Sequence, residues 1–371
     1  MTAVPGTAQG RSPPRNREEV VERLRALAAG SAPGARYPTV RQLMAELGVS
    51  QHLIQGAMDA LRQEGIISSH VGRGTFVSGG PVVAPQARSV LTLLYQHPYQ
   101  RGDVIARIIH QRLSIDGHES LMLTYSNAAH VMEILKSGAR YDAAIVQPRS
   151  SVVSVSLLAL LKQRAEHVLI EGLAFEHLDV DAVSNDPAKT VELITDHLFA
   201  RGHRRIAWIT EASSNYFFLR TASFFRASCR GAGLSEEECP VIVAETDPDK
   251  LGLRDLAGVV GQLKGKGKRL PFTALVVASF VDGRTIVDAL KSCGLSTPDD
   301  VAVVRLGTPD LDSDHVSLIT TAGRPSTRAA ETVLKRLHWR WASSTAPFQT
   351  YYDSPELNVM ASSAKAVGKS R

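Results

Sequence analysis

Cysteine is scarce in this chain of 371 residues, with only Cys229, Cys239 and Cys293 present. An odd number of cysteines, with neither a C-x-x-C pair nor a zinc-ligand spacing, fits free thiols in a reducing compartment. Long apolar runs are also missing, since no stretch approaches the ~18 residues of a membrane-spanning helix. The first residues, MTAVPGTAQGRSPPRNREE, contain no apolar core of a signal peptide. We therefore expect a cytoplasmic protein with no disulfide and no contact with a membrane.

Lysine is absent from the first 80 residues, where nine arginines stand beside six acidic residues. The whole chain has 42 basic and 37 acidic residues, so a net charge of +3 in this segment leaves +2 for the other 291 residues. Hydrophobic residues make up 44% of the chain, enough for cores in two or three domains. This composition excludes a disordered or fibrous chain, and the basic front favours a nucleic-acid partner modestly.

Between residues 16 and 78 the apolar spacing changes from helical to extended. Asn16, Thr39 and Ser50 are each placed to cap a helix. The pattern predicts helices over residues 16–29, 40–47 and 50–64 and extended segments over residues 66–70 and 75–78. The glycine-rich residues 71–74 predict a hairpin tip between the extended segments. The result is a small domain over residues 16–78, after a leader of residues 1–15 that we expect to be disordered.

The second and third predicted helices, joined at Gly48 and Val49, have the pattern of a helix-turn-helix. Apolar residues occupy one face of the third helix and leave Gln51, His52, Gln55 and Asp59 on the other. Such a helix fits the major groove of DNA, where amide side chains can make two hydrogen bonds to adenine. An ordinary solvated helix face is the alternative on the helices alone. The Gly-Arg-Gly tip at residues 72–74 favours DNA, because it lets the backbone approach a groove closely.

Residues Tyr37–Val77 resemble the DNA-binding domain of the GntR family of bacterial transcription regulators. The matching positions are Pro38, Arg41, Leu43, Gly48-Val49-Ser50, Ala57, Leu61, Gly65 and Gly72–Val77. The resemblance implies a winged helix-turn-helix whose DNA contacts come from Thr39, Arg41, Ser50, Gln51, His52, Gln55, Gly72, Arg73, Gly74 and Thr75. The family usually has arginine where this chain has Gln51 and Gln55, so the family's operator pattern cannot be carried over.

Beyond residue 88 apolar runs of β type alternate with amphipathic helical patterns. The predicted strands are Val90–Tyr95, Ala143–Val146, Val168–Ile170, Ile206–Ile209, Val241–Ala244, Ala274–Ala278 and Val301–Leu306. The predicted helices are residues 104–113, 131–137, 157–163, 188–200, 219–230, 251–263, 285–293 and 327–341. This rhythm predicts an α/β fold with parallel sheets covered on both faces, in two lobes over residues 89–363. Residues 79–88 are the predicted linker, and residues 364–371 the predicted flexible basic tail.

Several segments of this second part resemble the effector domain of the LacI/GalR family, which is similar to periplasmic sugar-binding proteins. They are Val183–Asp186, Thr190–Leu198, Arg201–Ala207, Arg220-x-x-Ser223-Phe224, Pro298–Val304 and Ser354–Leu357. The combination with a GntR-type domain also resembles regulators of the arabinose-repressor type. The resemblance implies an effector between the lobes, and the candidate contacts are Arg220, Phe224, Ser279, Phe280, Asn185 and Asp186.

The resemblance departs from the family at two acceptor positions. Ser279-Phe280 stand where the family has Asn-Asp, and Arg305–Gly307 stand where it has Gly-Phe-Asp. Arg220 and Phe280 both follow strands whose carboxyl ends are expected to open on the cleft, so they are predicted to reach one ligand. An arginine and an aromatic face favour a sugar acid, a phosphorylated sugar or another polar ring. An ordinary ion pair of Arg220 on a helix surface, and a sensor that has lost its ligand, remain open.

We expect neither catalysis nor a metal or other cofactor. No serine, cysteine or carboxylate arrangement suggests a reaction, and the calcium-loop pattern that starts at Asp310 has His315 and Thr321 where such a loop needs glycine and glutamate. We predict a transcriptional regulator, a repressor, that binds double-stranded operator DNA as a homodimer and responds to a small-molecule effector. The alternative is a small-molecule-binding protein whose DNA-binding domain is vestigial.

Overall fold

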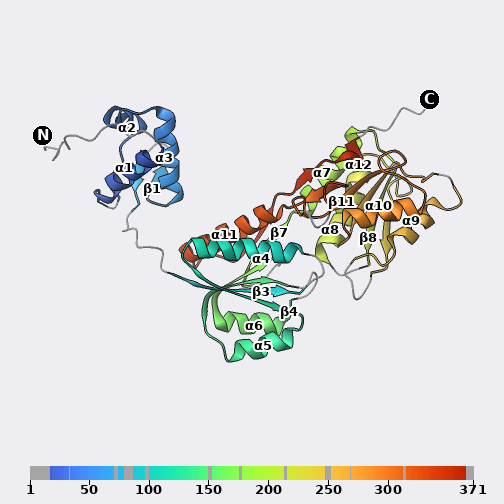
Figure 1. Ribbon diagram of the computed structural model, residues 1–371, viewed down its shortest axis with the longest axis horizontal. Coiled ribbons are helices and arrows are strands. Elements are labelled where there is room, and N and C mark those ends of the chain that lie inside the picture. The colour runs from blue at the N-terminus through green and yellow to red at the C-terminus, as the bar shows by residue number, and fades with distance from the viewer. Residues whose placement is uncertain are drawn as a thin grey trace. The chain divides into compact units, whose positions relative to one another are not determined.

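The chain folds into two compact units, Met1–Gln86 and Ala87–Arg371, in a computed structural model (Figure 1). The structure describes residues 17–32, 34–70, 74–78, 87–96, 100–148, 153–174, 178–212, 215–246, 252–267, 269–311 and 315–364. The expected leader at residues 1–15, most of the expected linker and the last seven residues lie outside these ranges. No helix in the described ranges is long and apolar enough to span a membrane.

The N-terminal unit contains three helices and a two-stranded sheet. Its elements are α1 (Arg17–Ala29), α2 (Val40–Leu47), α3 (Gln51–Gln63), β1 (Ile67–His70) and β2 (Gly74–Val77). Thr39 and Gln42 form a capping box at the start of α2, and Gly48 ends this helix with a φ of 67°. The Ser50 hydroxyl accepts a hydrogen bond from the Leu53 amide at the start of α3. The predicted caps at Thr39 and Ser50 are therefore confirmed.

The hairpin of β1 and β2 is antiparallel, with Ile67 opposite Val77. The Tyr37 amide donates a hydrogen bond of 2.7 Å to the Thr75 carbonyl, which ties the segment before α2 to the hairpin. Buried side chains from α1, α3 and the hairpin, among them Leu24, Ile54 and Val77, form the core of the unit. Three helices followed by this hairpin are a winged helix-turn-helix, as the sequence predicted.

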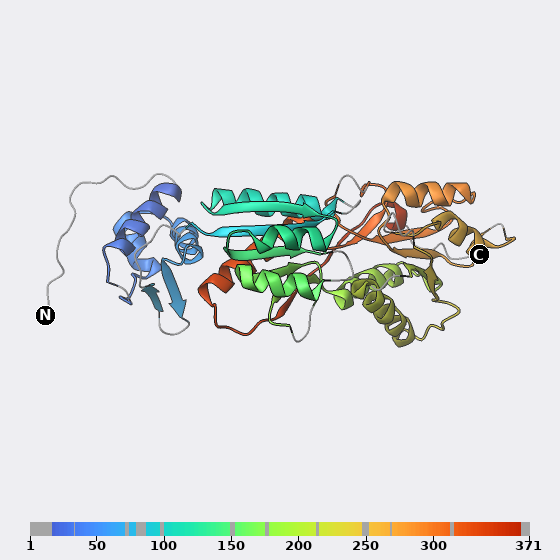
Figure 2. The ribbon, with the colours of Figure 1, turned by 90° about the horizontal axis from the view of Figure 1, so that it is seen from below.

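The C-terminal unit has two lobes, each built on a six-stranded sheet (Figures 1 and 2). In the first lobe the strand order is β13-β7-β6-β5-β3-β4, and all neighbours are parallel. These strands are β3 (Ser89–Tyr95), β4 (Glu119–Tyr125), β5 (Tyr141–Gln147), β6 (Ala165–Glu171), β7 (Asp181–Asn185) and β13 (Thr350–Asp353). Helices α4 (Arg101–Ile115) and α11 (Ser326–Ala342) cover one face, and α5 (Ala128–Lys136) and α6 (Val155–Arg164) cover the other.

In the second lobe the strand order is β14-β12-β11-β10-β8-β9, with β14 antiparallel to β12 and the other neighbours parallel. Its strands are β8 (Ile206–Glu211), β9 (Val241–Ala244), β10 (Ala274–Ala278), β11 (Ala302–Leu306), β12 (Thr320–Gly323) and β14 (Glu356–Asn358). Helices α7 (Pro187–Ala200) and α8 (Tyr216–Gly231) cover one face, and α9 (Leu256–Lys264) and α10 (Gly283–Ser292) cover the other. The short α12 (Ala361–Ala364) adjoins β11 and β12.

The chain crosses between the lobes three times. The crossings are residues 185–187 between β7 and α7, residues 323–326 between β12 and α11, and residues 353–356 between β13 and β14. The predicted two-lobed α/β fold is confirmed. The prediction missed β4, β7, β12, β13 and β14, and it started α9 at Leu251, whereas Asp255 caps this helix.

Candidate functional site

The exposed face of α3 carries Gln51, His52 and Gln55, as the helical spacing predicted. The opposite face is buried, with Ile54 and Met58 in the core of the N-terminal unit. The helix therefore presents two amide side chains, one turn apart, on a surface free of large apolar groups. This surface has the donors and acceptors that read base edges in a major groove.

The amino ends of α2 and α3 are a second feature of this unit. Thr39 and Ser50 cap the two helices through their hydroxyl groups, and neither helix has an acidic residue in its first turn. The positive ends of both helix dipoles are therefore not neutralised by carboxylates there, which suits contact with DNA phosphates. Arg41, in the first turn of α2, is exposed and adds a cation to this surface.

The hairpin is attached to the end of α3 by side chains. Arg62 Nε donates to Ser69 Oγ at 3.0 Å, and Ser69 Oγ lies 2.9 Å from the hydroxyl of Thr75. Gly74 has a φ of 107°, which residues with a side chain rarely adopt. Gly72 and Arg73, the other two residues of the predicted tip, lie outside the described ranges.

Arg36 is a cation that the sequence analysis did not single out. Its backbone forms an isolated bridge with Phe76, and a Cβ placed on Gly74 would lie 3.2 Å from Arg36 Nε. The exposed guanidinium of Arg36 thus lies against the base of the hairpin. Its position just before the Tyr37-Pro38 match was the signal that could have found it.

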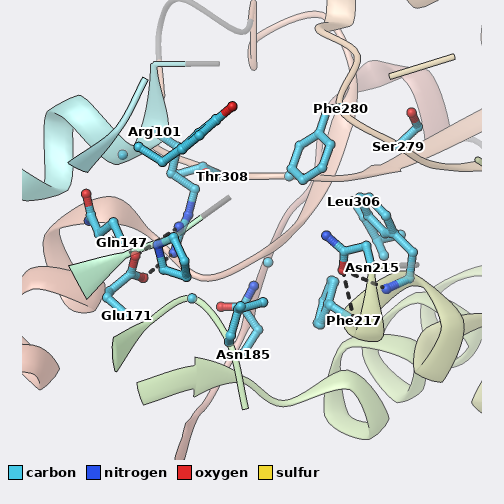
Figure 3. Close-up of a pocket in the computed structure, with 18 of the residues that line it drawn as sticks. Arg101, Gln147, Glu171, Asn185, Asn215, Phe217, Ser279, Phe280, Leu306 and Thr308 are labelled. Carbon is cyan, nitrogen blue, oxygen red and sulfur yellow. Dashed lines mark hydrogen bonds and ion pairs between the residues drawn. The ribbon is translucent and has the colours of Figure 1, made fainter. Parts of the chain in front are cut away.

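The C-terminal unit has a pocket between its lobes, at the carboxyl ends of the strands (Figure 3). It contains ≈ 1020 Å³ of empty space, part of which is open solvent. Four polar lining residues are the last residues of parallel strands of the first lobe: Tyr95, Gln147, Glu171 and Asn185. Open α/β sheets bind ligands at such strand ends, which identifies this pocket as the candidate ligand site.

Glu171 lies at the centre of a buried ion-pair network on the wall formed by the first lobe. Its carboxylate accepts hydrogen bonds from Arg101 Nη2 at 2.8 Å, from Gln147 Nε2 at 3.2 Å and from Arg324. Arg324 Nη1 is also 3.8 Å from a carboxylate oxygen of Asp353. The network joins the pocket wall to two of the three crossings between the lobes.

The charges of this network are balanced. Burial raises the pKa of Glu171, but the guanidinium groups of Arg101 and Arg324 lower this pKa by more than burial raises it. The pKa of Glu171 is therefore below its ordinary value. Burial lowers the pKa of Arg324 to about 10, which still leaves it charged at neutral pH. Two cations therefore face the carboxylates of Glu171 and Asp353, and the wall carries little net charge.

Two amide oxygens in the pocket have no hydrogen-bond partner among the described residues. They are Gln147 Oε1 and Asn185 Oδ1. Gln147 is oriented by its amino group, which donates to Glu171, so its oxygen is the atom that remains. Buried acceptors without partners are costly, and these two oxygens have almost no exposed surface.

The wall formed by the second lobe is mainly aromatic. Phe217, Phe218 and Phe280 line it, and the ring centroids of Phe218 and Phe280 are 5.1 Å apart in an edge-to-face arrangement. Ser279 donates a hydrogen bond of 2.6 Å to the buried Glu211. Asn215 caps α8, because its side-chain oxygen accepts from the Phe217 and Phe218 amides.

The structure brings three of the six predicted effector residues together in the pocket: Asn185, Ser279 and Phe280. Asp186, next to Asn185, caps α7 by accepting a hydrogen bond of 3.0 Å from the Lys189 amide. Asp186 is not among the residues that line the pocket.

Arg220 and Phe224 also lie outside the pocket lining. The first turn of α8 presents Phe217 and Phe218 to the pocket, and the following turns bury Thr221 and Ala222 on the core side, so Arg220 falls on the solvent side. Its guanidinium carbon is 5.0 Å from the centroid of the Phe224 ring. Arg220 is thus an exposed residue stacked on its own helix.

The sequence analysis did not single out Arg101, Gln147, Glu171, Asn215 or Thr308, all of which line the pocket. The available signal was position, because Gln147 and Glu171 end strands while Arg101 and Asn215 stand where helices start. Strand ends and helix starts at the same edge of a sheet are where such sites form. The missing information was which of these ends face each other.

The remaining candidates have structural roles. Asp310 accepts hydrogen bonds from Ser326 at the start of α11, and Asp312 and Asp314 lie outside the described ranges. The described residues contain no group of three or more side chains suited to a metal ion. Cys229, Cys239 and Cys293 are free thiols, as expected.

Two segments of the chain match known families. Residues 16–77 match the family described as "Bacterial regulatory proteins, gntR family", and residues 195–363 match the "Periplasmic binding protein-like domain". These matches confirm the two resemblances that the sequence motifs indicated. The first of these families consists of regulatory proteins, in agreement with the expectation that the chain is not an enzyme.

A curated relative matches most of the chain at low identity. The chain is 24% identical over 324 residues to an "Arabinose metabolism transcriptional repressor" of Geobacillus stearothermophilus, a match that covers 83% of this chain and 86% of the relative. Among solved structures, a LacI transcriptional regulator from a Rhodococcus species has a TM-score of 0.60 at 22% identity, over 76% of this chain and 99% of that one. A LacI family transcriptional regulator from Enterococcus faecium, solved with bound ribose, has a TM-score of 0.60 at 15% identity, over 76% of this chain and 100% of that one. At these identities the structural matches establish the fold.

Proposed function

We propose that this chain, a transcriptional regulator that joins a gntR-family domain to a periplasmic binding protein-like domain, binds operator DNA with its N-terminal unit and a hydroxylated small molecule in the pocket of its C-terminal unit. It works in the cytoplasm as a homodimer that places two winged helices on a two-fold operator. The observation that supports a ligand most directly is the pocket at the strand ends, whose lining includes the polar residues Gln147, Glu171 and Asn185.

In the proposed DNA complex, α3 lies in the major groove with Gln51, His52 and Gln55 against base edges. Thr39, Ser50 and Arg41 lie at the amino ends of α2 and α3 and contact phosphates. The hairpin, with Gly72, Arg73, Gly74 and Thr75, follows the adjacent groove or backbone. Arg36 joins this set, because its guanidinium lies against Gly74.

The proposed ligand is sugar-like, and it controls repression. The relative from Geobacillus stearothermophilus is named as a repressor of arabinose metabolism, and the Enterococcus faecium regulator holds ribose. The sequence predicted an anionic ligand because of Arg220, but Arg220 does not line the pocket. Arg101 does line it, and its charge is paired with Glu171. A ligand that binds one lobe arrangement better than another shifts the population of arrangements and thereby the operator affinity.

The test separates this function from a ligand-binding protein with a vestigial DNA-binding domain. The purified full-length chain is incubated with fragmented genomic DNA and random competitor DNA, and the fragments that it retains are sequenced. The affinity of the protein for each retained fragment is then measured by fluorescence anisotropy. We expect a fragment bound at least ~10³-fold more tightly than random DNA at physiological salt. Affinity equal to that for random DNA would establish the vestigial alternative.

A further inference from the structure

The two walls of the pocket differ sharply in chemistry. Figure 3 shows Arg101, Gln147 and Glu171 on one side and Phe217 and Phe280 on the other. The polar side contains an ion pair of 2.8 Å and an amide oxygen without a partner among the described residues. A ligand that fills this space meets hydrogen-bonding groups on one side and aromatic rings on the other.

Two polar side chains on the aromatic wall make hydrogen bonds within the protein. The Ser279 hydroxyl donates to Glu211, and the Asn215 side-chain oxygen accepts two amides of α8. Thr308 is the third polar side chain at this wall, and it is buried. A ligand hydroxyl turned toward the three phenylalanines loses water and finds few partners, which costs affinity.

A simple sugar carries hydroxyl groups around its whole perimeter, so it suits a pocket with polar groups on both walls. An aromatic ring has no hydroxyl groups that need hydrogen-bond partners, and it packs on phenylalanine rings in edge-to-face or offset geometry. Phe218 and Phe280 already adopt the edge-to-face arrangement, with their ring planes at 67°. The aromatic wall is therefore matched to an aromatic group, and the polar side chains of the opposite wall are matched to hydroxyls.

We propose that the ligand is an uncharged molecule in which an aromatic ring is joined to a hydroxylated ring. The aromatic ring lies against Phe217, Phe218 and Phe280, and the hydroxyls face the polar wall of Gln147, Glu171 and Asn185. This inference rests on the proposed function, since it assumes that the pocket is the effector site. Two sources share this chemistry, aryl glycosides and nucleosides, and the experiment distinguishes them.

The experiment measures binding of matched pairs to the full-length protein by isothermal titration calorimetry. The pairs are L-arabinose with 4-nitrophenyl α-L-arabinofuranoside, D-glucose with phenyl β-D-glucoside, and D-ribose with adenosine and cytidine. In at least one pair, the aromatic compound is expected to bind about tenfold more tightly than its sugar. The pair that shows the difference identifies the source as a glycoside or a nucleoside.

Two variants test whether the aromatic wall causes the difference in affinity between the aromatic compound and its matched sugar. Phe280→Leu keeps apolar bulk but removes a ring, and it is expected to weaken the aromatic compound about three- to tenfold while changing the affinity for the matched sugar little. Tyr216→Leu is the control, because Tyr216 precedes Phe217 on α8 but does not line the pocket. Equal weakening by the two variants would overturn the assignment of the aromatic wall.

Two further outcomes overturn the inference and are separable from failure of the proposed function. Sugars that bind as tightly as their aromatic partners would show that the phenylalanine rings pack on a sugar face. In that case the proposed function, ligand binding and operator binding, would still hold. A complete lack of binding by the aromatic compounds would refute the ligand class. Operator binding, measured on the same samples by anisotropy, tests the proposed function independently of either result.

Discussion

Arg324 and Glu171 form a buried ion pair although they are 153 positions apart in the chain. Arg324 belongs to the crossing between β12 and α11, and Glu171 ends β6 at the pocket wall. Arg101, which lines the pocket, donates to the same carboxylate. The wall of the candidate ligand site and one crossing between the lobes therefore share a single carboxylate.

Replacing Arg324 with methionine is expected to destabilise the protein strongly. The substitution leaves Glu171 and Asp353 buried with fewer cations, and removal of one partner from a buried pair costs about 3 to 5 kcal/mol. Urea unfolding of the purified variant measures the change. The control is Arg328→Gln, since Arg328 pairs with Glu356 with both side chains more than 40% exposed, and loss of such a pair costs at most about 1 kcal/mol. Equal losses in the two variants would contradict the role of the buried network.

Stability is expected to fall as the pH is lowered from about 6.5 to about 4 because of His203. Burial lowers the pKa of His203 from 6.5 to about 4, so between these values the unfolded chain binds a proton that the folded chain does not. Unfolding therefore becomes more favourable as the pH falls through this window. Melting temperatures measured in steps of half a pH unit should decline less for His203→Gln than for the wild type. His130→Gln, at an exposed position, is the control and should follow the wild type.

The operator half-site is expected to favour A·T at the two positions that Gln51 and Gln55 contact. A glutamine amide matches the adjacent acceptor and donor of adenine, and each good pair discriminates by about 1 to 3 kcal/mol. Selection of sites from a random DNA pool reads the preference directly. Guanine at both contacted positions would be incompatible with this assignment of the α3 surface.

Removal of a hairpin cation is expected to weaken binding to all DNA sequences alike. Arg73→Ala and Arg36→Ala should each reduce the slope of log K against log salt by about one unit, because one fewer phosphate is neutralised. Anisotropy titrations at several salt concentrations provide the slope. Arg230→Ala, at an exposed position of α8 in the C-terminal unit, serves as the control. An unchanged slope for Arg73→Ala would remove the hairpin from the DNA contacts.

Local patterns predicted the parts of this protein that depend on local interactions. The caps at Thr39 and Ser50 and the exposed face of α3 follow from residue types a few positions apart. The edge strand β4 was missed although it contains the apolar run Leu121–Leu123, and none of its residues is fully buried. The pocket network was missed because Arg101, Glu171 and Arg324 meet only in three dimensions.

The case of Arg220 shows what a motif leaves undetermined. The family motif predicted an arginine near the start of the helix after β8, and Arg220 does lie on α8. The face of the helix on which it falls depends on where the helix starts, and Asn215 starts α8 so that Phe217 and Phe218 line the pocket instead. A shift of one or two residues in a helix start moves a side chain by 100° to 200° around the axis.

The regulation proposed here requires a ligand in the pocket that changes the affinity for operator DNA. The direct measurement is operator affinity by anisotropy, with and without the tightest-binding compound of the calorimetric panel, for the wild type, Asn185→Leu and Arg220→Ala. The account predicts that the compound weakens operator binding of the wild type and of Arg220→Ala by about 5- to 150-fold. Asn185→Leu, which removes a polar side chain from the pocket wall, should bind the operator normally and respond little. A response that Arg220→Ala abolishes and Asn185→Leu retains would contradict the account.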